Sequence, residues 1–172
     1  MRAICAGLLL SLTIVSADAG ERSAHLINSF QVMCTIEPLN FARTEERATA
    51  MRLPVSEDKR SPPSAVGFSV RSKSWVLPLN SGPHDLAATE GTGPKGAIKG
   101  CGIAAADADG TDFRAELIKT LGLKRPAAER TSPDGTLKTD FWAYGPNGLE
   151  IMFARRTDRP GIYLFLQTPV AK

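Results

Sequence analysis

The 172-residue sequence predicts an α+β fold, in which N-terminal helices and one central helix pack on an antiparallel sheet that ends in a three-strand meander. Three observations predict it. Apolar residues recur at helical spacing over 26–51 and 113–121. They alternate with polar residues over 66–70 and again from residue 137, as in half-buried strands. Turns rich in glycine and proline separate these segments, so each can form one element.

The N-terminal part predicts a first helix. Leu26, Phe30, Met33 and Cys34 recur at helical spacing. Pro38 ends that segment, because proline lacks the backbone N–H that a helix needs. The four residues would therefore share one buried face.

A second helix follows at once. The side chain of Asn40 can cap it, and Phe41, Ala48 and Met51 share its apolar face. The stretch 56–64 (SEDKRSPPS) is charged and rich in proline, so we expect a loop there. The residues expected to face water on this helix are Arg43, Glu45, Glu46 and Arg47.

The central part predicts strands. Residues 66–70 alternate apolar with polar side chains, and 75–77 form a further apolar patch. Segments 84–90 and 97–106 have the pattern of a strand pair joined by a glycine-rich turn.

The central helix is the clearest element. Thr111 is its expected N-cap and Gly122 its expected C-cap. Its apolar stripe consists of Phe113, Leu117, Ile118 and Leu121. Turns at 145–148 and 159–161 then separate the three strands of the predicted meander, which are 137–144, 149–153 and 162–167.

The first nineteen residues have the pattern of a cleavable signal peptide. Arg2 supplies the positive charge, residues 3–15 are apolar or small with few exceptions, and 17–19 (ADA) match a cleavage site. We expect cleavage after Ala19, which leaves a single exported domain, 20–172. The alternative is a buried N-terminal helix. The apolar run is too short to span a bilayer, so we expect a bacterial periplasmic or secreted protein without a membrane span.

Two cysteines would survive cleavage, Cys34 and Cys101. In an oxidising compartment two such cysteines usually pair, and closing a loop of about 65 residues contributes roughly 4 kcal/mol. A catalytic thiol and a metal site are the alternatives. Two cysteines and two histidines at unrelated spacing match no zinc pattern, so we expect neither metal nor cofactor.

Two short motifs resemble ligand-binding loops. Residues 91–96 match G-x-G-x-x-G, but a proline lies inside the motif and a strand-like segment follows it, so a hairpin loop is expected. Residues 107–112 resemble the start of a calcium loop. Asp112 stands where that loop needs glycine, and Ile118 stands where it needs glutamate.

Few residues suggest chemistry or binding. His84 lies in a turn-forming stretch, where an ordinary surface histidine is expected, and there is no Gly-x-Ser-x-Gly motif. Trp142 and Tyr144 share one predicted strand face, and Arg155 and Arg156 follow on the next strand. Aromatic residues beside arginine often anchor protein interfaces, although a strand packed beneath a helix gives the same pattern.

The sequence thus favours a non-enzymatic periplasmic or secreted protein that binds another macromolecule, such as an inhibitor, immunity or envelope-accessory factor. The net charge of +3 is too small to indicate nucleic acid, so the expected partner is a protein or envelope component. The alternatives are a small exported hydrolase that uses His84 and a small-ligand-binding module.

Overall fold

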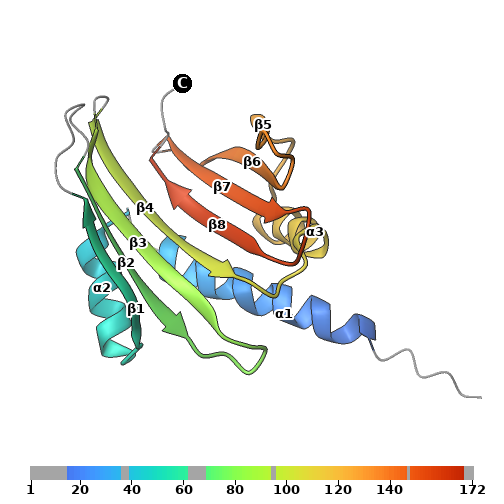
Figure 1. Ribbon diagram of the computed structural model, residues 1–172, viewed down its shortest axis with the longest axis horizontal. Coiled ribbons are helices and arrows are strands. Elements are labelled where there is room, and N and C mark those ends of the chain that lie inside the picture. The colour runs from blue at the N-terminus through green and yellow to red at the C-terminus, as the bar shows by residue number, and fades with distance from the viewer. Residues whose placement is uncertain (1–14, 36–38, 62–68, 94–95, 147, 169–172) are drawn as a thin grey trace, which may run out of the picture.

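A computed structural model describes residues 15–35, 39–61, 69–93, 96–146 and 148–168. Its centre is one antiparallel eight-stranded sheet with the strand order β1-β2-β3-β4-β8-β7-β6-β5 (Figure 1). The strands are β1 (Val55–Ser61), β2 (Ser69–Leu77), β3 (His84–Gly93), β4 (Gly96–Ala105), β5 (Ala128–Thr131), β6 (Leu137–Tyr144), β7 (Leu149–Arg156) and β8 (Ile162–Gln167).

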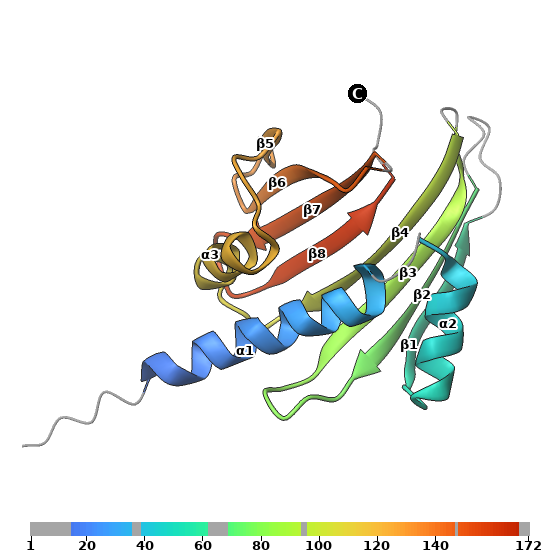
Figure 2. The same cartoon turned by 180° about the vertical axis from the view of Figure 1, so that it is seen from behind.

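All the described helices lie on one face of this sheet, as Figure 2 shows from behind. They are α1 (Val15–Phe30), the π-helical turn η1 (Gln31–Thr35), α2 (Phe41–Ala50) and α3 (Gly110–Leu121). We call this side the helical face and the other side the uncovered face. The α+β prediction is correct, and the sheet dominates the fold.

The core fills the space between the helices and the sheet. Alternate residues of the strands point toward the helices and are buried, because successive side chains of a strand point to opposite faces. The core residues from the strands include Trp75, Leu86, Ile103, Ile151, Phe153 and Leu164, and those from the helices include Leu26, Ile27, Phe30, Phe41, Phe113 and Leu117.

A disulfide joins Cys34 in η1 to Cys101 in β4, with the Cα atoms 5.3 Å apart. This confirms the pairing expected from the sequence. Both cysteines are buried. The bond therefore fixes the end of the first helical segment on the centre of the sheet.

The C-terminal half completes the sheet from its far edge inward. After α3 the chain forms the edge strand β5 and then returns through β6, β7 and β8. β8 pairs with β4 at the centre, for example Leu164 opposite Ile103. The predicted three-strand meander is thus present as β6-β7-β8, but it is part of a larger sheet and β5 extends it.

The helix caps explain where two helices begin. The side chain of Asn40 accepts a hydrogen bond from the Arg43 N–H (3.3 Å), as predicted. For α3 the predicted cap was wrong by two residues, because Asp109 accepts from the N–H groups of Thr111 (2.8 Å) and Asp112 (3.0 Å). Gly122 ends α3 in the left-handed conformation (φ 62°), as expected.

The loop predicted over 56–64 is wrong in its first part, because 55–61 form β1. All seven residues of β1 are exposed, so no apolar alternation marks it as a strand. Its charged side chains suit an edge strand, where they oppose pairing with other chains. The rest of that loop and the apolar residues Val66 and Phe68 lie outside the described residues.

Residues 1–14, most of the predicted signal peptide, also lie outside the described residues. The backbone of 15–19 forms the beginning of α1, so the expected cleavage after Ala19 would fall inside this helix. Export therefore stays a prediction. None of the helices that the structure describes is long and apolar enough to span a membrane.

Candidate functional site

Trp142, the centre of the predicted binding surface, lies in the core. Its side chain points to the helical face and the residue is 3% exposed. The indole Nε1 donates to the Lys124 carbonyl (2.9 Å), and the Arg114 guanidinium lies 5.9 Å from the ring centroid. Tyr144 is half-buried on the same face and packs against the core. This is the strand packed beneath a helix that the sequence also allowed.

The two arginines of that surface point to opposite faces. Arg155 lies opposite Lys138 on the helical face, where it and Arg114 donate to the buried carboxylate of Asp140 (3.3 and 2.6 Å). Arg156 lies on the uncovered face and donates to Asp158 through two nitrogens (2.9 and 2.7 Å). The structure thus places Trp142, Tyr144 and Arg155 on the same face of the sheet and Arg156 on the other. Arg155 lies apart from the two aromatic residues, because it pairs with Lys138, six residues along β6 from Tyr144.

The uncovered face carries a row of large apolar side chains. Phe165, Met152 and Phe141 lie opposite one another on β8, β7 and β6. The row continues across β4 at Gly102, where a Cβ would collide with the Phe165 ring. All three large side chains are half-buried, and none of the described helices covers them (Figure 1).

Tyr163 enlarges this apolar row toward the turn between β7 and β8. Its side chain is among the most exposed of the large apolar ones, with the residue 44% exposed. A hollow of about 240 Å³ opens beside it, with Ala104, Arg156 and Arg159 in its walls. The row itself carries no charge, but the Arg130 guanidinium lies 5.0 Å from the centroid of the Phe141 ring. Arg156 and Glu150 lie on the same face beside the row.

His84 is buried, which corrects the expectation of a surface histidine. It begins β3, points to the helical face and is 3% exposed. Neither ring nitrogen has a well-aligned hydrogen-bond partner among the described residues. Burial, and then the nearby charge of Arg22, lowers the pKa of His84 to about 4, although Asp85, the Gly82 backbone and Asp107 act in the opposite direction.

This burial predicts acid sensitivity. The unfolded chain binds a proton at His84 below pH 6.5, whereas the folded protein binds it only near pH 4. The free energy of unfolding should therefore fall as the pH drops from 6.5 to 4, by about 3 kcal/mol from this residue. Urea unfolding of the wild type across this range measures the loss.

The matched variant is His84→Leu, which removes the titrating ring and keeps an apolar side chain. The difference in unfolding free energy between wild type and variant isolates His84, because the carboxylates titrate in both proteins. We expect that difference to change by about 3 kcal/mol between pH 7.5 and pH 4. Parallel pH curves for the two proteins would contradict the prediction.

Arg22 joins three parts of the chain next to His84. Its guanidinium donates to the carbonyls of Gly82 (2.5 Å) and Pro83 (3.1 Å) and to the carboxylate of Asp107 (2.6 Å). The residue is buried on α1, so these bonds hold the β2–β3 connection and the β4–α3 turn against the helix. Asp107 is therefore engaged in an ion pair, and Asp109 caps α3.

His25 on α1 contacts a serine. Its Nδ1 lies 3.2 Å from the Ser81 hydroxyl, in the connection between β2 and β3. Its Nε2 lies 4.0 Å from the carboxylate of Glu21, one helical turn earlier. No pattern in the sequence indicates this contact, because 56 residues separate His25 from Ser81.

An apolar groove of about 430 Å³ has His25 in its wall. It runs between the end of α1, η1, the end of α2 and the connection after β2. Val32 and Met51 are 55% and 52% exposed in its walls, an unusual exposure for large apolar side chains. Its remaining lining residues are Asn28, Ser29, Met33, Leu77, Pro78, Leu79 and Asn80.

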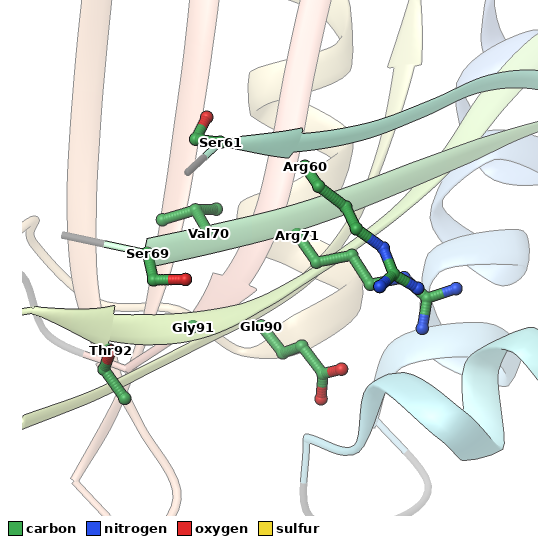
Figure 3. A pocket seen from close by; sticks show the side chains of 8 residues that line it. All are labelled: Arg60, Ser61, Ser69, Val70, Arg71, Glu90, Gly91 and Thr92. Atoms are coloured by element: carbon green, nitrogen blue, oxygen red, sulfur yellow. The ribbon is translucent and has the colours of Figure 1, made fainter. Parts of the chain in front are cut away.

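A wider hollow of about 510 Å³ lies where β1 and β3 end and β2 begins (Figure 3). Arg60, Arg71 and Glu90 stand opposite one another on the three strands and point to the same side of the sheet. Arg71 is already bound, since it donates to Glu45 (3.3 Å) and lies over the Phe41 ring (4.3 Å). We assign this hollow no ligand.

Within the described part of the chain, no three histidine, cysteine or acidic side chains converge in a way that could hold a metal ion. No protein-family model matches the chain, and no curated protein or solved structure is similar enough to it to count as a match.

Proposed function

We propose that the protein binds another protein outside the cytoplasm, and that its docking surface is the uncovered face around Phe141, Met152, Tyr163 and Phe165. The observation that carries the proposal is the row of large apolar side chains on a sheet face without helices. The disulfide supports a location outside the cytoplasm, because such bonds persist in oxidising compartments.

The chemistry of this surface favours a protein partner with an apolar patch. Protein interfaces have an uncharged, aromatic-rich centre and a polar rim. The row supplies such a centre, and Arg156 and Glu150 supply charges of both signs at its border. A nucleic acid would instead need a band of positive charge for its phosphates.

The shape of the surface offers a place for an anchoring side chain. The hollow beside Tyr163 has a volume of about 240 Å³ and is bordered by Arg156 and Arg159. Interfaces often gain most of their affinity where one large side chain of the partner fills such a hollow. We therefore expect the partner to insert an apolar side chain beside Tyr163.

A photo-cross-linking amino acid at position 163 tests the docking surface in cells. We expect one discrete adduct with a different protein, identified by mass spectrometry. The same cross-linker at Thr120, which is exposed on α3, is the matched control and should give no such adduct. Met152→Lys, which places a charge in the apolar row, should reduce the adduct at least tenfold.

Thr120→Lys adds the same charge elsewhere and should leave the adduct at 163 unchanged. Melting temperatures of both lysine variants show whether each is folded. Equal cross-linking from positions 163 and 120 would overturn the proposal, and so would an adduct made only of two copies of this chain. An adduct that persists in folded Met152→Lys would place the docking surface elsewhere.

A further inference from the structure

We propose that the protein also hydrolyses small esters with an apolar acyl chain, with Ser81 as nucleophile and His25 as general base. The site lies on the helical side, away from the proposed docking surface, and does not depend on it. For a hydrolase, His25 is a better base than the His84 expected from the sequence. His84 is buried, and neither of its ring nitrogens has a serine or a carboxylate among the described residues within hydrogen-bond distance.

The proposal depends on three side chains that lie next to one another in space, a carboxylate, an imidazole and a hydroxyl. The Ser81 hydroxyl lies 3.2 Å from Nδ1 of His25, within the reach that a general base requires. The Glu21 carboxylate lies 4.0 Å from Nε2 on the other side of the ring. At 4.0 Å the carboxylate makes no hydrogen bond to the ring, but its negative charge stabilises the imidazolium that forms when His25 takes the Ser81 proton.

The fold positions these three groups. Glu21 and His25 are four residues apart on α1, so they lie on the same side of the helix. Ser81 lies in the turn that the Gly82 N–H closes by donating to the Leu79 carbonyl (3.0 Å). Arg22 binds the carbonyls of Gly82 and Pro83, and this holds the turn against α1.

Arg22 also adds a fixed positive charge beside the nucleophile. Its Nη1 lies 3.5 Å from the Ser81 oxygen, at the limit of a hydrogen bond. A cation held there favours negative charge on that oxygen and on an adjacent oxyanion. Asp107 balances part of this charge from the other side of the guanidinium.

The adjoining groove determines the substrate class. His25 and Asn80, the residue before Ser81, form part of its wall, so the general base and the backbone next to the nucleophile border a space of about 430 Å³. Val32, Met33, Met51 and Leu77 make most of that space apolar, and none of the described residues that line it is an arginine or lysine. The groove therefore suits the hydrocarbon chain of a short acyl group rather than a phosphate or a sugar.

The reaction consumes one water molecule per ester. The Ser81 oxygen forms a bond to the acyl carbon while the Ser81 proton moves to Nδ1 of His25. The ester C–O bond then breaks, and the same proton passes to the departing alcohol. Water repeats the sequence on the acyl-serine, which releases the carboxylic acid and restores Ser81.

Two measurements on the purified protein test the site. A fluorophosphonate probe, which labels activated serines, should modify Ser81 of the wild type, as peptide mass spectrometry would detect. Hydrolysis of p-nitrophenyl butyrate should fall at least about 100-fold in Ser81→Ala and in His25→Asn, the usual effect of losing a nucleophile or its base. p-Nitrophenyl acetate should react more slowly than the butyrate, because its acyl chain leaves the groove empty.

Ser56→Ala is the matched control, because it removes the same hydroxyl from an exposed residue of β1 that is not part of the groove lining. Its rate should stay within twofold of the wild type. The fluorophosphonate labelling is measured on the wild-type protein, so misfolding of a variant cannot affect its result. Absence of the probe from Ser81 would overturn the proposal, and so would butyrate hydrolysis that survives in folded Ser81→Ala.

Discussion

Replacing Cys34 and Cys101 together by alanine is expected to lower the free energy of unfolding by about 4 kcal/mol. The bond spans 67 residues of sequence, so its loss frees a long loop in the unfolded chain. Both cysteines are buried among apolar residues, and alanine leaves no polar group there. For a chain of this length the melting temperature should fall by roughly 8–16 °C.

Urea unfolding of the double variant and of the reduced wild type measures this effect. The two should agree closely, because each removes the same covalent constraint. Val32→Ala is the matched control, since it truncates an exposed residue near Cys34 and should change the unfolding free energy by less than about 0.5 kcal/mol. If the free energy of unfolding of the double variant falls by less than about 1 kcal/mol, the prediction is contradicted, and the disulfide does not constrain the unfolded chain as expected.

Trp142→Ala is expected to destabilise the protein by about 3–5 kcal/mol, the usual cost of truncating a large aromatic core residue. The residue is 3% exposed and its indole N–H satisfies the Lys124 carbonyl, so both packing and a hydrogen bond are lost. Trp142→Phe keeps most of the volume and should cost about 1–2 kcal/mol. Chemical denaturation of the two variants gives both numbers.

The control for Trp142 is Tyr163→Ala, which truncates an exposed aromatic residue of the same sheet on its other face. It should cost far less stability than Trp142→Ala but should weaken binding of the partner. The opposite pattern, a stable Trp142→Ala that no longer binds, would restore Trp142 as a binding residue. The pair thus separates a core role from a surface role.

Local patterns predicted the elements whose burial follows a simple period. Gly122 ends α3, and Cys34 lies on a buried helical stripe, because these features depend on residues close in sequence. The edge strand β1 was not predicted, because its residues show no such period. It is exposed along its whole length, so only its pairing with β2 makes it a strand.

The candidate sites were harder to predict, because each depends on which side a residue faces. Arg155 and Arg156 are neighbours in sequence, yet they lie on opposite faces of the sheet. The contact between His25 and Ser81 joins a helix to a distant turn. No pattern of spacing predicts such a contact, because it depends on how α1 crosses the sheet.

The sequence by itself determined the α+β class, most of the elements and, through the count of two cysteines after the predicted cleavage, the disulfide. Tertiary structure alone decided that the strands form one sheet with helices on a single face. It thereby buried Trp142 and His84 and left Phe141, Met152, Tyr163 and Phe165 uncovered. The physical reason is that alternation assigns a residue to one of two faces, whereas packing decides which face the helices cover.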